Sequence, residues 1–198
     1  ISEGSDVAAS ERLVIAPTTG YVGIGTVTPG SELHVQGSAS PILHVESTGD
    51  GKGVLALDGD RAGAGSAVGQ IRFQWNNTRV AEIACLSGAD TTNKDEGELG
   101  FFTAPAGTIY ERMRIASDGK VGIGTNSPQS LLHLQGSVPT IILHDTRTSV
   151  AGHDYGRIQW HTADTSMPGT NDIGAEIRAY DDSDTYGDRA ALLFSTAH

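Results

Sequence analysis

Residues 119–136 read Gly-Lys-Val-Gly-Ile-Gly-Thr-Asn-Ser-Pro-Gln-Ser-Leu-Leu-His-Leu-Gln-Gly. Residues 20–37 read Gly-Tyr-Val-Gly-Ile-Gly-Thr-Val-Thr-Pro-Gly-Ser-Glu-Leu-His-Val-Gln-Gly. The two stretches start about one hundred residues apart and share a Val-Gly-Ile-Gly-Thr core, a proline and a Leu-His pair at matched places. Self-similarity at a fixed spacing is the signature of a repeat. The chain is therefore predicted to contain two tandem units of one design.

The likeness extends beyond these stretches. Glu-Arg at residues 11–12 precedes the first copy as Glu-Arg at 111–112 precedes the second, and Gly-Gln-Ile-Arg-Phe at 69–73 corresponds to Gly-Arg-Ile-Gln-Trp at 156–160. We predict the end of a preceding segment at residues 1–10, a first β-rich module at 11–110 and a second at 111–198. The chain starts without methionine and stops where the first module continues, so we expect an excerpt of a longer polypeptide.

Alternation with a period of two dominates both modules. Ile71, Phe73 and Trp75 alternate with polar residues, and the same alternation occurs at residues 157–161 and 109–115. Turn-forming residues separate these segments, and no amphipathic helix with a cap is evident. The predicted fold class is mostly β. Trp75 and Trp160 could stack on sugars, but their alternation with polar neighbours favours core positions.

The glycines of the repeated motif are predicted to serve close packing. Read as a strand, Val-Gly-Ile-Gly-Thr places its valine, isoleucine and threonine on one face and leaves the other without side chains. A bare face allows another backbone to approach. The candidate close-packing glycines are Gly23, Gly25, Gly122 and Gly124.

Composition excludes several classes of partner. The 198 residues include 13 basic and 24 acidic ones, a net charge of −11 that repels nucleic acid and anionic membrane surfaces. No apolar run approaches the roughly 20 residues that a membrane-spanning helix needs. Cys85 is the one cysteine and cannot form an intrachain disulfide. Its strand-like setting with Ala81 and Ile83 predicts a small core residue.

The motif Gly-x-Val-Gly-Ile-Gly-Thr-x-x-Pro-x-x-x-Leu-His-Val-x-Gly resembles the repeat of the fibrous regions of bacteriophage tail fibres and related virion appendages. This repeat often lies upstream of an endosialidase-type intramolecular chaperone. The resemblance covers residues 20–37 and 119–136 directly. It implies an intertwined homotrimeric fibre, located on the virion and outside the cell. Expected partners are further copies of the chain, other virion or fibre proteins, and a glycan or protein of the host surface.

Two places in the sequence carry residue types that can ligate a metal ion. Four repeated histidines could ligate an ion around a threefold axis, but they lack paired His-x-His spacing, and strand histidines opposite a core face are expected to be solvated or hydrogen-bonded. The acidic loop at residues 181–188 starts like a calcium loop, yet a tyrosine takes the third ligand place and no glutamate closes it. We predict neither a metal nor a cofactor. The histidines are His34, His44, His133 and His144.

The loops in which the two modules differ most are the candidate receptor contacts, because binding residues concentrate on loops. The two loops occupy equivalent hairpins and differ in spacing and composition. The candidate residues are Asp90, Asn93, Lys94, Asp182, Asp184 and Tyr186.

Catalysis is not expected. Neither a Gly-x-Ser-x-Gly nor a His-Glu-x-x-His motif occurs, and a proline instead of a helix follows each Gly-x-Gly, which argues against a phosphate loop. The glutamates that recur are expected to be structural: Glu11 and Glu111 paired with the adjacent arginine, and Glu82 and Glu176 facing solvent. Two alternatives to a phage tail fibre remain: a bacterial surface adhesin or filament subunit, and the non-catalytic carrier region of a polysaccharide-degrading fibre.

Overall fold

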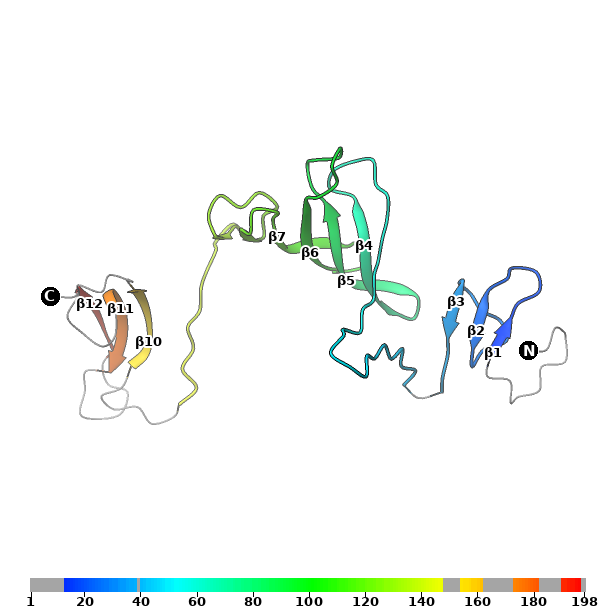
Figure 1. Cartoon of the computed structure of the whole chain (residues 1–198). Helices are drawn as coiled ribbons and strands as arrows, with labels where there is room; N and C mark the ends of the chain where they lie inside the picture. The colour runs from blue at the N-terminus through cyan, green and yellow to red at the C-terminus, as the bar shows by residue number, and fades with distance from the viewer. Residues whose placement is uncertain (1–12, 39, 148–153, 162–172, 182–189, 197–198) are drawn as a thin grey trace. The chain divides into compact units, whose positions relative to one another are not determined.

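The computed structural model describes residues 13–38, 40–147, 154–161, 173–181 and 190–196. Within these ranges every regular element is a β-strand, which confirms the prediction of a mostly β fold (Figure 1). The described part of the chain contains no helix that could cross a membrane. The strands are β1 (Leu13–Ile15), β2 (Val22–Ile24), β3 (Leu33–Val35), β4 (Ala67–Trp75), β5 (Thr78–Ser87), β6 (Gly97–Thr103), β7 (Tyr110–Ile115), β8 (Val121–Ile123), β9 (Leu132–Leu134), β10 (Asp154–His161), β11 (Ile173–Asp181) and β12 (Ala190–Thr196).

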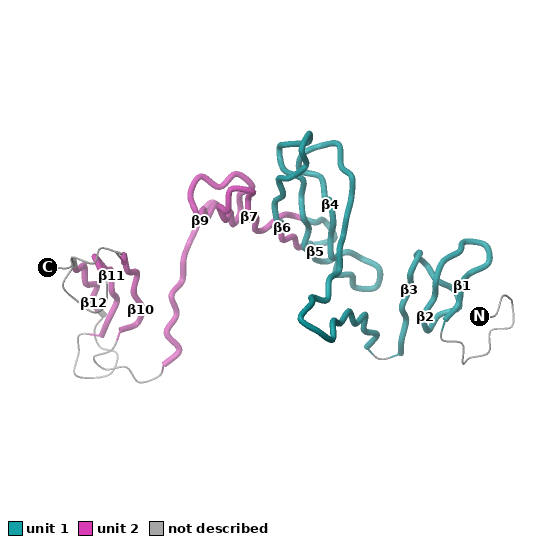
Figure 2. The backbone as a smooth tube through the Cα atoms, in the orientation of Figure 1, with its two compact units in different colours: residues 1–100, 104–109 teal, residues 101–103, 110–198 magenta. Residues whose placement is uncertain are grey.

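The chain divides into two compact units (Figure 2). The first comprises residues 1–100 and 104–109, and the second comprises residues 101–103 and 110–198. The first unit holds the sheet β1-β2-β3 and the hairpin β4-β5, and the second holds the strands β7-β8-β9 and the sheet β10-β11-β12.

The two copies of the glycine motif have the same strand order and register. β1 pairs antiparallel with β2, which pairs parallel with β3, and β7, β8 and β9 do the same. Val14 lies opposite Gly23 in the first copy, and Arg114 lies opposite Gly122 in the second. The reversal between the first two strands is also shared, since the amide of Gly20 bonds to the Ala16 carbonyl and that of Gly119 bonds to the Ala116 carbonyl.

The glycine-rich strands are shorter than the alternation predicts. β2 ends at Ile24 and β8 ends at Ile123, because the following glycines have positive φ angles of 73° and 77° and turn the chain out of the ladder. A Cβ on Gly124 would lie 2.2 Å from the Gln135 carbonyl oxygen, and Gly25 faces Gln36 in the same way. The backbone that approaches the bare glycines belongs to the same chain.

The inner glycines of the motif meet the turn that follows them. A Cβ on Gly23 would lie 2.3 Å from the carbonyl oxygen of Thr26, and one on Gly122 would lie 2.3 Å from that of Thr125. Real Cβ atoms do not approach a backbone oxygen this closely, so glycine is required for the turn to fold back over the strand.

The longer antiparallel pairs also share a register. Ile71 lies opposite Ile83 in β4 and β5, and Ile158 lies opposite Ile177 in β10 and β11. Each pair has a register shift before its first glycine and another after its aromatic residue, Phe73 or Trp160. Two residues with positive φ, Asn76 and Asn77, close the β4-β5 hairpin as a two-residue turn.

The core of the single chain is thin. Among the described residues, the apolar side chains that are buried are Val14, Ala84 and Leu86. Every sheet leaves one apolar face about half exposed, including Leu13, Ile24 and Leu33 of the first sheet. The chain alone does not cover the apolar faces that its sequence pattern creates.

Candidate functional site

One face of the β4-β5 hairpin is apolar and exposed. Residues directly opposite in a sheet share a face, so Ile71 and Ile83, Phe73 and Ala81, and Gly69 and Cys85 lie on the same side. Ile71 is 50% exposed, and Cys85 is exposed. We call Ile71, Phe73, Ile83 and Cys85 the first apolar face. The prediction that Cys85 is a core residue is wrong for the single chain, because no described residue packs over this side closely enough to bury it.

The sheet β10-β11-β12 repeats this surface in the second unit. Ile158 pairs with Ile177, which pairs with Phe194, and Ala179 takes the place of Cys85 beside Leu192. Ile158 is 49% exposed. We call Ile158, Trp160, Ile177, Leu192 and Phe194 the second apolar face. Part of it forms a groove of about 190 Å³ with Leu143 and Tyr155.

The two tryptophans contradict their predicted core positions. Trp75 is 79% exposed, and Trp160 is 53% exposed. Their alternation with polar residues correctly identifies a common apolar side of each strand, but the described part of the single chain supplies no second layer to cover that side. Burial of these indoles therefore requires either another molecule or a bound ligand.

The opposite face of the hairpin carries a buried carboxylate. Glu82 is only 6% exposed and pairs with Arg79 at 2.9 Å and Arg72 at 3.5 Å. Glu176 occupies the same register in the second unit, where it accepts a hydrogen bond from Gln159 at 3.0 Å. The prediction that both glutamates face solvent is wrong. Each is a structural acceptor that holds the side chains of the neighbouring strand.

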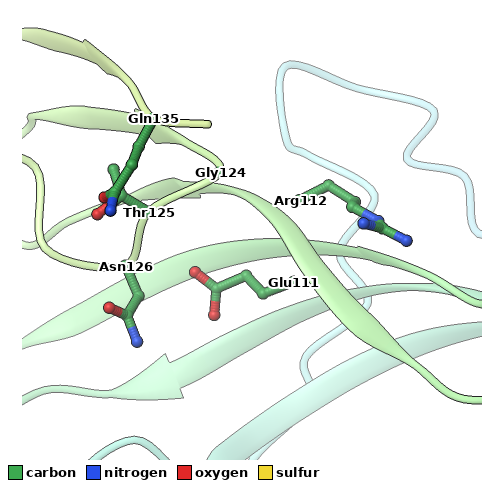
Figure 3. A pocket seen from close by; sticks show the side chains of 6 residues that line it. All are labelled: Glu111, Arg112, Gly124, Thr125, Asn126 and Gln135. Atoms are coloured by element: carbon green, nitrogen blue, oxygen red, sulfur yellow. The ribbon is translucent and has the colours of Figure 1, made fainter. Parts of the chain in front are cut away.

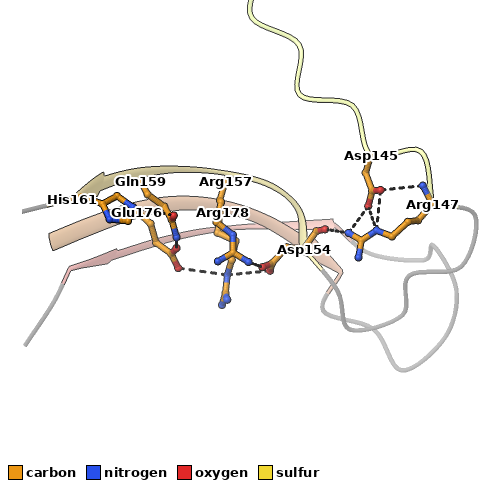
Figure 4. A network of polar contacts seen from close by, with 8 residues as sticks. All are labelled: Asp145, Arg147, Asp154, Arg157, Gln159, His161, Glu176 and Arg178. Carbon is orange, nitrogen blue, oxygen red and sulfur yellow. Dashed lines mark hydrogen bonds and ion pairs between the residues drawn. The ribbon is translucent and has the colours of Figure 1, made fainter. Parts of the chain in front are cut away.

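A wider polar network surrounds Glu176 (Figure 4). Asp154 pairs with Arg157 and lies 3.4 Å from Arg178. Arg147 binds the Asp145 carboxylate through its guanidinium, with a shortest contact of 2.6 Å, and it also donates to the Asp154 carbonyl. The hydrogen bonds from Arg147 lower the pKa of Asp145 to about 2. This network ties the segment before β10 to the start of that strand.

The same tether occurs in the first unit, where the sequence comparison did not find it. Arg61 donates to the carbonyl of Ala67 at 2.8 Å, and Ala67 stands two residues before Gly69 as Asp154 stands two residues before Gly156. Leu57 packs against Gly69, as Leu143 packs against Gly156. In the sequence alone, Leu143-His144 corresponds instead to Leu43-His44, because both are Leu-His pairs that lie one hundred residues apart.

The described receptor-contact candidates lie on the loop between β5 and β6. Asp90 accepts hydrogen bonds from the amides of Thr92 and Asn93 at 2.8 and 3.0 Å, and these bonds lower its pKa. Lys94, with a φ of 57°, forms an ion pair with Asp60, whose pKa it lowers. The loop borders a pocket of about 200 Å³, which is lined by Asp58, Gly59, Asp60, Arg61, Val68, Ser87, Asp90, Thr91, Lys94 and Glu96.

The loop therefore presents both signs of charge on a defined backbone. The other three candidates, Asp182, Asp184 and Tyr186, lie outside the described residues.

A second polar pocket, of about 330 Å³, lies beside β7 and β8 (Figure 3). Glu111 was predicted to pair with Arg112, which is wrong: its carboxylate bonds to Arg114, with two contacts of 2.7 Å. Arg112 points to the other side of the strand, where it donates to Thr103 at 2.9 Å and stacks over Tyr110. Because Arg112 contacts Thr103 and Tyr110 while Glu111 contacts Arg114, the two neighbours do not pair with each other. The lining residues are Glu111, Arg112, Gly124, Thr125, Asn126 and Gln135.

The repeated strand histidines support the turn before them. Nδ1 of His34 accepts the amide of Gly30 at 3.3 Å, and Nδ1 of His133 accepts that of Gln129 at 3.4 Å. His44 and His144 are exposed. In the described part of the chain, no group of three or more histidine, cysteine, aspartate or glutamate side chains is arranged to hold a metal ion. Glu11 and Arg12 lie outside that part.

A solved structure similar to this chain is the carboxy-terminal domain of the bacteriophage T5 L-shaped tail fibre with its intra-molecular chaperone domain. The TM-score is 0.41, and the sequence identity is 11% over 79% of this chain. The match spans 57% of the other chain, which is less than two thirds of its length. No protein-family model matches this chain, and no curated protein does.

Proposed function

We propose that the chain is a structural and adhesive segment of an extracellular fibre, in which copies of the chain pack their apolar faces together. The observation that carries this proposal is the recurrence of the exposed apolar face at matched register in both units. Covering the exposed half of each isoleucine, leucine or phenylalanine would contribute roughly 1 kcal/mol. The net charge of −11 on each copy opposes association, so apolar burial must outweigh it.

The number of copies and the biological setting rest on the resemblance of residues 20–37 and 119–136 to tail-fibre repeats. We propose a homotrimer of two tandem modules in a phage tail fibre, without catalytic activity, attached to other virion proteins. The matched strand registers of the two units support the interpretation that they are tandem repeats of one module. A bacterial adhesin or filament subunit would use the same self-association, and so would the carrier region of a polysaccharide-degrading fibre.

The loop around Asp90, Asn93 and Lys94 is the proposed contact with a host-surface glycan or protein. Its support is geometric, since hydrogen bonds within the loop and the ion pair with Asp60 hold polar side chains at the rim of a pocket. Several copies around a fibre axis would present this loop repeatedly, so that weak single contacts give strong attachment overall.

Cys85 provides a direct test without any mutation, because it is the one cysteine and lies on the first apolar face. In the native chain we expect its reaction with a thiol reagent to be on the order of a hundredfold slower than in urea, since packing against another copy would shield it. The readout is the rate of labelling followed by mass spectrometry.

Two cysteine variants in a Cys85→Ala background provide matched controls. Ala179→Cys places the thiol at the equivalent position of the second apolar face and should be protected to the same extent. Thr91→Cys places it on the exposed loop and should react rapidly. If Cys85 reacts as fast as the loop cysteine under native conditions, the apolar face is not an interface between copies.

A further inference from the structure

Trp75 is set apart from the recurring apolar faces by its position. It ends β4 beside the two-residue turn of the β4-β5 hairpin, and at 79% it is far more exposed than the other aromatic residues of that strand face. Phe73 and Trp160 share a register, and in the sequence the residue two places after Trp160 is a threonine, Thr162, which lies outside the described residues. An association surface common to both modules does not require an indole there.

The hairpin tip is also conformationally defined. Asn76 and Asn77 have φ angles of 48° and 64°, which close the two-residue turn with a twist that matches the strands. The Gln74 side chain donates to the Asn77 carbonyl at 3.4 Å, and Trp75 pairs with Thr78 across the ladder. The backbone that carries the indole is therefore fixed by the turn, which reduces the ordering cost of binding a ligand against it.

The chemistry of the tip selects the kind of ligand. Residues 74–78 read Gln-Trp-Asn-Asn-Thr, so residues with amide and hydroxyl side chains flank one aromatic residue in the sequence, and none of the five is ionisable. Amide side chains both donate and accept hydrogen bonds, as sugar hydroxyls do, and an indole offers a flat apolar surface for the C–H face of a sugar ring. A pairing of aromatic surface with a few placed polar groups is typical of small-molecule sites.

We propose that the β4-β5 hairpin tip binds a neutral saccharide, which stacks on the Trp75 indole and hydrogen-bonds to the amides of Asn76 and Asn77. An anionic sugar is disfavoured by the net charge of −11 and by the absence of a cation within residues 74–78. This site is separate from the loop around Asp90, and among the described residues it occurs in the first module. The proposal rests on the adhesive role proposed above and adds a second surface to it, with a neutral sugar as its ligand, and it does not depend on the number of copies.

The test uses the whole chain on an array of neutral oligosaccharides ending in glucose, galactose, mannose or N-acetylglucosamine. A sugar that binds is then titrated into a Trp160→Phe variant, in which Trp75 is the sole indole. Phenylalanine is suited to position 160 because Phe73 occupies that register in the first unit. We expect the sugar to change Trp75 fluorescence, and Trp75→Ala to weaken binding by about tenfold or more.

Three results would each overturn the proposal: no binding across the array, equal binding by Trp75→Ala, or a Trp75 shielded from acrylamide in the native Trp160→Phe protein. The last result would mean that another protein surface covers the indole. Solution mass measured on the same variants separates this outcome from a failure of self-association, because loss of sugar binding with an unchanged mass concerns the hairpin tip alone.

Discussion

Ile71→Asp and Ile158→Asp, alone and combined, are expected to convert the assembled protein to single chains at micromolar concentration. Both side chains are about half exposed in the single chain, so a carboxylate there is tolerated by the folded monomer. In a packed interface it would be an unpaired charge, which costs more than about 3 kcal/mol. The dissociation constant should therefore rise at least about a hundredfold, measured by analytical ultracentrifugation.

The control for this substitution lies on the same strand. Gln74→Asp adds the same charge to β4 at an exposed position on the other face, so it should leave the mass unchanged. Circular dichroism would establish that all variants keep their β content. If Ile71→Asp and Ile158→Asp associate as tightly as Gln74→Asp does, the apolar faces are not the contact between copies.

Gly124→Ala is expected to destabilise the β7-β8-β9 strands more than any other alanine substitution in the motif's turns. Gly124 combines a positive φ of 77° with a Cβ position only 2.2 Å from the Gln135 carbonyl oxygen. The left-handed conformation alone costs an alanine about 1–2 kcal/mol, and the clash is with backbone, which cannot rotate away. We expect a loss of at least about 2 kcal/mol in the free energy of unfolding, measured by urea titration.

Substitutions at two other glycines of the motif separate the cost of the left-handed backbone from the cost of the clash with Gln135. Gly119 has a φ of 84° and open space around its Cβ position, so Gly119→Ala should lower stability only through the strain of a left-handed alanine backbone. Gly136 has neither a positive φ nor a close atom, so Gly136→Ala should be nearly neutral. Equal effects of Gly124→Ala and Gly119→Ala would show that the close approach to Gln135 is not a constraint.

Much of the local structure could be predicted from sequence because it is encoded locally. The strand at Ile71, Phe73 and Trp75 follows from alternation, and the hairpin follows from Asn76-Asn77, whose short amide side chains tolerate positive φ. The need for glycine in Val-Gly-Ile-Gly-Thr also follows from the sequence, although the approaching backbone proves to be the chain's own.

Which face of a strand is covered could not be predicted. Alternation assigns Cys85 and Ile83 to one side and Glu82 and Ala84 to the other, but it does not say whether the chain supplies a second layer. The usual assumption that the apolar side of a strand is buried gives the wrong result for both residues. Cys85 is exposed in the single chain, and Glu82 is buried. In a chain whose apolar faces would be covered by other copies, this assumption fails for any single chain.

The tether from Arg61 to β4 was also beyond sequence reasoning. Arg61 lies six residues before Ala67, whereas Arg147 lies seven residues before Asp154, so no fixed spacing connects them. Their equivalence follows only from the carbonyl that each arginine contacts. The signal that could have suggested it is an aspartate shortly before each arginine: Asp60 directly precedes Arg61, and Asp145 lies two residues before Arg147.

The measurement that tests self-association most directly is the solution mass of the 198-residue chain, determined by light scattering over a range of concentrations. We predict a stable mass of three times the 20.6 kDa chain, because each copy exposes apolar faces that further copies would cover and because the resemblance to tail-fibre repeats implies three copies. A mass of one chain that persists at the highest concentration would contradict the proposed fibre assembly.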